Sequence, residues 1–117
     1  MIRPEIFESW QRCYAMGMDP LSKERLPLIS REEINERLEK NKLLMSVVTP
    51  YMDSIYEMIK GSGFRVDFND SEGYCLRSFC DKDTLEICEK TNSFPGANRR
   101  ESVAGTNSIG IALLTGK

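Results

Sequence analysis

Gly61–Asn69 reads GSGFRVDFN, and at this stretch the periodicity of the chain changes from helical to alternating. Apolar and polar residues then alternate, which is typical of a strand with one packed face and one solvated face. Asn69–Gly73 (NDSEG) has the composition of a tight turn, and Tyr74–Cys80 (YCLRSFC) follows as a second strand. The sequence therefore predicts an antiparallel β-hairpin over residues 64–80.

A helical arm is predicted directly before this hairpin. Ser30 and Glu33 form a capping-box pattern, and apolar residues then repeat at helical spacing as far as Ile59. Pro50 interrupts this pattern, and it either kinks one long helix or begins a second one. The apolar face of the arm either packs in the core or pairs with another helix at a dimer interface, and the two roles are compatible. The residues expected to pack this arm are Ile34, Leu38, Met45, Ile55 and Ile59.

Further helices are predicted on both sides of the arm and hairpin, so the expected fold class is α+β. The expected elements are a helix over Arg3–Met16, an irregular connector, the helical arm, the hairpin, a weak helix over Asp81–Lys90, a loop over Thr91–Arg100, and a last helix capped by Thr106 or Asn107 and ended by Gly116. The expected division is residues 1–29 as N-terminal helix and connector, 30–61 as the long helix or kinked helix pair, and 62–117 as the remaining domain.

Composition excludes several classes of function. The 117 residues are 40% hydrophobic and 29% charged, which suits one ordinary folded domain. With 16 basic and 18 acidic residues the chain has no basic excess, so direct contact with DNA is not expected. It contains no histidine, which removes Ser-His-Asp triads, Cys-His dyads and histidine metal sites. An enzyme is therefore not expected.

The four cysteines and the chain ends give weaker indications. No two of the four cysteines form a C-x-x-C pair; they are Cys13, Cys75, Cys80 and Cys88. They are expected to be buried thiols in a cytoplasmic protein. The alternative is a metal or redox sensor built from Cys75, Cys80 and Cys88. No cofactor is expected, and neither a secretory signal nor a membrane-spanning stretch is recognisable in the sequence.

Three motifs carry a resemblance to a known family. They are Ser9–Cys13 (SWQRC), Asn69–Tyr74 (NDSEGY) and, after Glu101, Ala104–Gly110 (AGTNSIG). With these motifs the chain resembles the N-terminal GAF-type sensor region of sigma-54-dependent transcriptional activators, of the type that controls acetoin and glycerol/dihydroxyacetone operons. The resemblance is distributed over the whole chain.

The resemblance implies a helical arm followed by the first part of a GAF-like domain, namely its first hairpin and a helix. It also implies a truncated chain, because the family continues into further strands, an ATPase domain and a helix-turn-helix domain. The implied function is to sense a small-molecule metabolite and to dimerise, so that the missing domains are controlled. The alternatives are a protein-interaction module that binds a metabolic enzyme subunit, or the cysteine-based sensor described above.

Candidate ligand-binding residues come from the hairpin and from the last motif. Glu101 could bond buried backbone amides or pair with Arg99 or Arg100, and a scaffold role is favoured over ligand contact for residues at helix caps. A two-stranded hairpin is marginal by itself, so self-association as a homodimer through the helical arm is also expected. The candidate ligand-binding residues are Phe64, Val66, Phe68, Leu76, Arg99, Glu101, Thr106 and Asn107.

Overall fold

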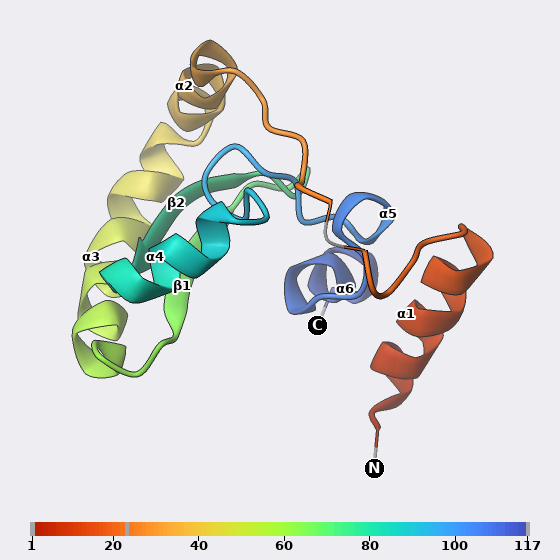
Figure 1. The fold of residues 1–117 in the computed structure, drawn as a ribbon. Coiled ribbons are helices and arrows are strands. Elements are labelled where there is room, and N and C mark those ends of the chain that lie inside the picture. The colour runs from red at the N-terminus through yellow and green to blue at the C-terminus, as the bar shows by residue number, and fades with distance from the viewer. Residues whose placement is uncertain (1, 23, 117) are drawn as a thin grey trace.

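A computed structural model describes residues 2–22 and 24–116 of the chain and confirms the α+β class. Figure 1 shows α3 and α4 on opposite sides of a two-stranded hairpin, while α5 and α6 lie between this hairpin and α1. The elements are α1 (Pro4–Ala15), α2 (Arg31–Lys40), α3 (Lys42–Ile59), β1 (Arg65–Asn69), β2 (Cys75–Cys80), α4 (Lys82–Glu89), α5 (Glu101–Ala104) and α6 (Ser108–Thr115). Among the described residues, no helix is both long and apolar enough to cross a bilayer.

The hairpin forms as the alternation predicts. β1 pairs antiparallel with β2, from Arg65 opposite Cys80 to Asn69 opposite Cys75. A register shift at the turn end leaves Leu76 without an opposite residue, which makes this position a β-bulge. Because of the bulge, the alternation of faces along β2 is interrupted there.

Side-chain chemistry holds the turn between the strands. The Asp70 Oδ1 atom accepts hydrogen bonds from the backbone N–H groups of Glu72, at 3.0 Å, and Tyr74, at 2.9 Å. Gly73 has a φ of 93°, and a Cβ at this position would lie 3.0 Å from the Arg100 side chain. A residue without a side chain is therefore required at this point of the turn.

One face of the hairpin packs on α3. The Arg77 guanidinium donates to Thr49 Oγ1 of α3 at 3.1 Å, and the rings of Phe79 and Tyr56 are 6.3 Å apart between centroids. Val66 and Phe68 are the cross-strand partners of Phe79 and Arg77, so they share this face.

A third segment extends the hairpin beside the turn end of β2. The Cys75 N–H donates to the Ala97 carbonyl at 2.8 Å, and the Arg99 N–H donates to the Gly73 carbonyl at 2.7 Å. Tyr74 and Asn98 form an isolated bridge between these bonds. Residues 96–99 therefore run antiparallel to residues 73–75, and Ala97 and Arg99 point to the same face as Cys75.

The helical arm breaks at Asn41 and not at Pro50. The Asn41 side chain donates to the Arg37 carbonyl at 2.7 Å, where α2 ends, and α3 then runs without interruption through Pro50. The Ser30 half of the capping box is confirmed, because Ser30 Oγ accepts from the Glu33 N–H at 3.1 Å, whereas the Glu33 carboxylate pairs with Arg37 at 3.7 Å. Asn41 thus caps the end of α2 twice, because its backbone N–H also donates to the Arg37 carbonyl, at 3.1 Å.

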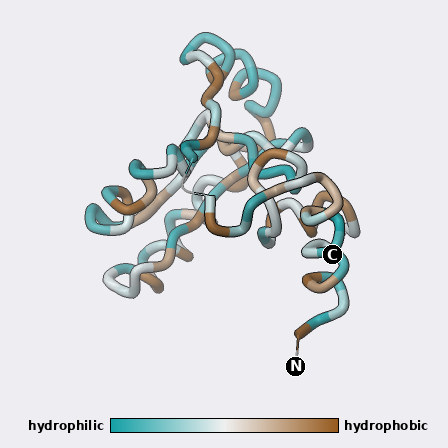
Figure 2. The backbone as a smooth tube through the Cα atoms, turned by 45° about the vertical axis from the view of Figure 1, so that its right-hand side comes forward, coloured by the Kyte–Doolittle hydropathy of each residue, from teal (hydrophilic) through white to brown (hydrophobic). Residues whose placement is uncertain are grey.

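The packing expected for the arm is correct in part. Ile34 and Met45 are buried, whereas Ile55 is 47% exposed and the most buried side chain of α3 belongs to Met52. The expectation for Ile55 is wrong because the hairpin covers the neighbouring face of α3. Figure 2 shows α2 as an almost entirely hydrophilic coil at the top of the molecule.

The first helix is amphipathic as predicted, but its apolar face points outward. Ser9 and Cys13 are its buried residues, and it packs on α5 and α6. Phe7, Trp10 and Tyr14 are 52%, 47% and 87% exposed, respectively. The side of α1 that faces the molecule is therefore formed by small side chains, and its aromatic stripe stays open.

Candidate functional site

A buried cluster joins the first and last of the three motifs. Glu101, the first residue of α5, is only 5% exposed, and it receives a hydrogen bond from the Ser9 hydroxyl. Arg12 binds both oxygens of the same carboxylate, with Nε at 2.7 Å and Nη2 at 2.9 Å. Thr106 Oγ1 lies 2.7 Å from Ser9 Oγ and 3.5 Å from Cys13 Sγ. These five residues are called the Glu101 cluster below.

Charge pairing explains how a carboxylate can lie in the interior. The bidentate hydrogen bond from Arg12 lowers the pKa of Glu101 and outweighs the burial, which acts in the opposite direction. The expected pairing of Glu101 with Arg99 or Arg100 is therefore wrong, since Arg12 of α1 is the partner. No local signal indicates this pairing, because the two residues are 89 positions apart.

The rest of the last motif forms a backbone scaffold. Asn107 caps α6 by accepting from the Gly110 N–H at 2.9 Å, and its amide donates to the carbonyls of Arg99 and Gly105, both at 2.8 Å. A Cβ on Gly110 would lie 2.9 Å from the Glu101 backbone nitrogen. Glycine at this position therefore lets α6 approach the start of α5.

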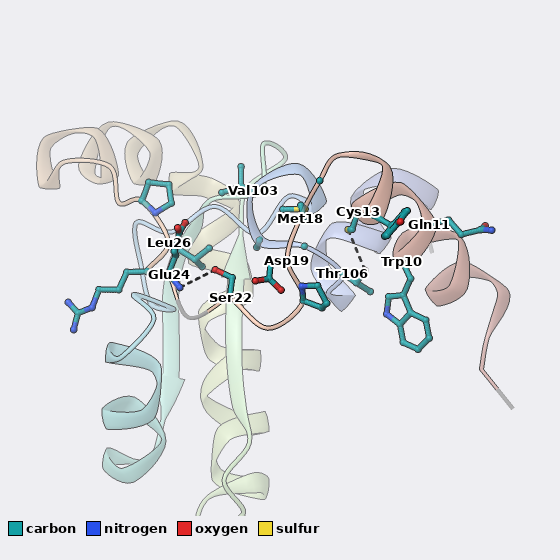
Figure 3. A pocket seen from close by; sticks show the side chains of 17 residues that line it. Trp10, Gln11, Cys13, Met18, Asp19, Ser22, Glu24, Leu26, Val103 and Thr106 are labelled. Carbon is teal, nitrogen blue, oxygen red and sulfur yellow. Dashed lines mark hydrogen bonds between the residues drawn. The ribbon is translucent and has the colours of Figure 1, made fainter.

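An open groove lies beside the Glu101 cluster. Its volume is about 1250 Å³, and α1, the connector up to Pro27, and residues 103–106 form its walls. Figure 3 shows Trp10, Leu26 and Val103 among the residues that line the groove. Cys13 and Thr106 line it as well (Figure 3), and they also belong to the Glu101 cluster. Such a volume holds a small organic molecule, and the mixture of apolar and polar walls suits one with both kinds of group.

A smaller hollow of about 560 Å³ lies on the other side of the same cluster. Arg12, Arg100 and Glu101 are among its polar residues, and Met16 and Leu113 are among its apolar ones. The Glu101 cluster therefore separates two hollows.

The second polar arrangement is on the hairpin face that points away from α3. The Arg65 Nε donates to Asp67 Oδ2 at 2.9 Å, and Ser78 Oγ donates to Asp67 Oδ1 at 2.6 Å. Arg65 Nη1 also donates to the Ser93 carbonyl and to Cys88 Sγ, the latter at 2.9 Å. This surface is called the polar face below.

The structure does not bring the eight candidate ligand-binding residues together. Phe64 is 70% exposed, Val66 and Phe68 face α3, and Leu76 is buried at the bulge. Arg99 lies on the polar face, whereas Glu101 and Thr106 belong to the Glu101 cluster. Their role in ligand binding stays a prediction, but the eight residues do not line one common cavity.

The cysteines are all free thiols. Cys75 is fully buried, and burial raises the pKa of its thiol to about 12, which makes it unreactive. Within residues 2–22 and 24–116, no three cysteine or carboxylate side chains are grouped as metal ligands. The metal version of the cysteine hypothesis therefore has no site in the described part of the chain.

Comparison with known proteins agrees with the motifs. No protein-family model matches the chain. The chain is 34% identical over 112 residues to a signal-transduction and transcriptional-control protein of Clostridium beijerinckii, a match that covers 92% of this chain and 17% of that protein. It is 27% identical to the acetoin dehydrogenase operon transcriptional activator AcoR of Bacillus subtilis, over 96% of this chain and 18% of that protein.

The chain is related to bacterial transcriptional regulators. An acetoin catabolism regulatory protein of Cupriavidus necator matches as well, with 26% identity over 96% of this chain and 17% of that protein. The resemblance to transcriptional activators is thus confirmed. The chain spans less than a fifth of the length of these curated relatives.

A solved structure shares the fold. A chain in the crystal structure of the E. coli DhaR(N)–DhaL complex superposes with a TM-score of 0.89, at 17% sequence identity. The superposition covers 98% of this chain and 39% of that chain. The arrangement of helices around the hairpin, including the outlying α1, is therefore one that a solved protein also adopts.

Proposed function

We propose that this chain is the sensor region of a sigma-54-dependent transcriptional activator, and that a small metabolite binds it in the cytoplasm. The observation that carries the proposal is the groove of about 1250 Å³, one wall of which is a helix attached through a polar cluster. Homology to transcriptional regulators supports it. In this proposal, DNA contacts and ATP hydrolysis belong to other parts of the regulator.

The position of α1 provides a way to transmit the signal. A ligand in the groove contacts α1 on one side and residues 103–106 on the other, so it favours the docked position of α1. A ligand shifts such an equilibrium only by its difference in affinity for the two states. We therefore place the two states of the sensor in the docked and undocked positions of α1.

An enzymatic role is not part of this proposal. The two buried carboxylates among the described residues, Glu101 and Asp70, are already bound. Arg12 and Ser9 donate to Glu101, and Arg37 and backbone N–H groups of the turn donate to Asp70. General acid–base catalysis needs a group that can exchange its proton with a substrate.

The test is a thermal-shift and calorimetric screen of the purified chain with small diols, ketones and organic acids. A binding compound is expected to raise the Tm of the wild type. Trp10→Ala, which alters the groove wall, should weaken binding roughly tenfold, because it removes a large apolar contact. Phe7→Ala is the matched control on the same helix, because Phe7 is similarly exposed but lies outside the groove. If none of these compounds shifts the Tm, the small-molecule version is contradicted.

A protein partner is the second candidate. The solved structure with the same fold was crystallised as a DhaR(N)–DhaL complex, and here α1 exposes an aromatic stripe of Phe7, Trp10 and Tyr14. Exposed aromatic residues are typical anchors of protein interfaces. Calorimetry with a purified DhaL-type subunit tests this version. Binding that is lost in Phe7→Ala supports a protein partner, whereas that variant should leave metabolite binding unchanged.

Self-association belongs to the same proposal. The outer face of α3 carries exposed apolar side chains at spacings of three and four residues. An antiparallel second copy would bring Lys42, near one end of the stripe, close to Asp53 and Glu57 near the other. The stripe consists of Leu44, Val47, Tyr51, Ile55 and Met58, with exposed fractions from 47% to 84%.

A further inference from the structure

Arg99 lies on the polar face of the hairpin. The bonds between residues 96–99 and 73–75 place Arg99 on the same side as Cys75, and Cys75 is the cross-strand partner of Asn69. Alternation along β1 then puts Asn69 on the side of Asp67 and Arg65. Four polar side chains, three from β1 and one from residues 96–99, therefore share one face of the hairpin.

The charges on this surface do not balance. Asp67 is the only acidic residue of these four. Both of its carboxylate oxygens already accept hydrogen bonds, Oδ2 from Arg65 and Oδ1 from Ser78. Within the described ranges, Arg99 forms no ion pair. Two guanidinium groups against one carboxylate leave a net charge of plus one.

The Arg99 side chain also has no hydrogen-bond partner among the described residues, although its backbone is paired. Its Nε is buried and unpaired, and on the same face the Asn69 Oδ1 atom is buried and unpaired as well. Burial, followed by repulsion from Arg65, lowers the pKa of Arg99, and the Asp67 carboxylate, which acts in the opposite direction, does not outweigh them. Unsatisfied buried polar atoms are rare in native proteins, so these two atoms favour a bound group that supplies their hydrogen-bond partners.

We propose that Arg99, with Arg65 beside it, binds the carboxylate of a small organic acid on the polar face of the hairpin. A guanidinium presents a planar fork of N–H donors that matches a carboxylate. The single negative charge of a monocarboxylate neutralises the net charge of plus one on this surface, whereas the two negative charges of a phosphate dianion would leave it negative. The residue is partly exposed, so an acid can reach it from solvent. This inference rests on the proposed sensor function and names the chemical class of one effector.

The experiment compares acids with their neutral amides. Binding of acetate, lactate and pyruvate to the purified chain, and of acetamide and lactamide in parallel, is measured by calorimetry in a buffer of low chloride. Binding is expected for the acids and not for the amides. Arg99→Gln should weaken acid binding roughly tenfold to a hundredfold, because a charge-assisted hydrogen bond is lost. Arg100→Gln is the matched control, since Arg100 is exposed and adjacent, and it should bind within about twofold of the wild type.

The stability of the ligand-free variants gives an independent readout. Arg99→Met removes an uncompensated charge but keeps the aliphatic stem, so its Tm should equal or exceed that of the wild type. A large fall in Tm would show that Arg99 holds the fold together, and it would overturn the proposal.

The outcomes separate this inference from the sensor function. Equal binding of acids and amides, or acid binding that survives Arg99→Gln, overturns the carboxylate site. Binding of neutral diols or ketones without binding of acids also overturns it, but leaves the sensor function standing. No binding of either class contradicts both.

Discussion

At the scale of single residues, Glu101 is the group on which most other contacts depend. Its carboxylate accepts hydrogen bonds from Ser9 and Arg12 of α1, while its backbone nitrogen lies close to Gly110 of α6. A buried carboxylate that loses its hydrogen-bond partners strongly destabilises the folded state, so α1, α5 and α6 have to be positioned together. The first and last motifs are therefore coupled through this one carboxylate.

Glu101→Gln is therefore expected to lower the free energy of unfolding by about 1–3 kcal/mol, because the charge-assisted pair with Arg12 is lost while the shape is kept. This loss of unfolding free energy is smaller than that expected for a fully buried ion pair, because the Arg12 side chain is 42% exposed. Urea unfolding followed by circular dichroism measures the change. Glu36→Gln, on the exposed face of α2, is the control, and its effect should stay within about 0.5 kcal/mol. Equal effects of the two variants would contradict a special role of Glu101.

At the scale of elements, α1 and α3 both leave apolar faces uncovered. On α1 the open face is aromatic and borders the groove, and on α3 it is a stripe on the side away from the hairpin. A helix in an isolated monomer normally buries its apolar side. We therefore propose one interaction for each of these two open helical faces.

Tyr51→Glu should prevent self-association through α3, because it places a charge in the middle of the apolar stripe. Sedimentation velocity at micromolar concentration is expected to show a dimer for the wild type and a monomer for this variant. Ser46→Glu adds the same charge to the same helix at an exposed position outside the stripe, and it should remain dimeric. A compact wild-type monomer at this concentration would disprove the dimer.

The elements follow from local sequence signals to a large extent. The hairpin, the Ser30 cap, the Asn107 cap and the weak helix α4 all form where short-range patterns predict them. The break in the arm is misplaced because Asn41 ends α2 with its own side chain, while Pro50 is tolerated inside α3. The short helix α5 has no periodicity of its own, so the sequence does not reveal it.

The sites follow from the sequence to a smaller extent. Glu101 and Arg99 are recognisable as candidates, but their surroundings depend on pairings between distant segments. The partner of Glu101 lies on the first helix, and the position of Arg99 depends on residues 96–99 pairing with the turn end of β2. Neither pairing has a local pattern. The alternation within β1 does separate the two faces of the hairpin correctly, but it does not tell which face packs on α3.

At the scale of the whole molecule, several titrating groups connect elements, so stability depends on pH. Glu101 has a lowered pKa in the folded state, so its contribution is complete above its ordinary value of 4.5 and is lost as the pH falls through the folded pKa. Tyr56 and Cys75 have pKa values raised to about 12, so their contributions persist below their ordinary values of 10.0 and 9.0 and are lost as the pH rises towards 12.

The difference in Tm between the wild type and Glu101→Gln is therefore expected to be constant from about pH 6 to 8 and to shrink below pH 4.5. Differential scanning calorimetry across this range measures it. Asp81, whose pKa is also lowered, is present in both proteins, so the difference isolates Glu101. A difference that does not change with pH would show that Glu101 stabilises the fold by shape and not by charge.

The connection between Arg12 and Glu101 has a consequence for synthesis on the ribosome. The first helix is made before its binding site, which is complete only when Thr106 has left the exit tunnel. Until then the two sides of the future cluster are solvent-exposed, and we expect the aromatic stripe of α1, which stays open even after docking, to offer a chaperone an apolar surface. Docking of α1 closes a loop of almost the whole chain, so it is expected to be a late step of folding and the first contact to open on unfolding.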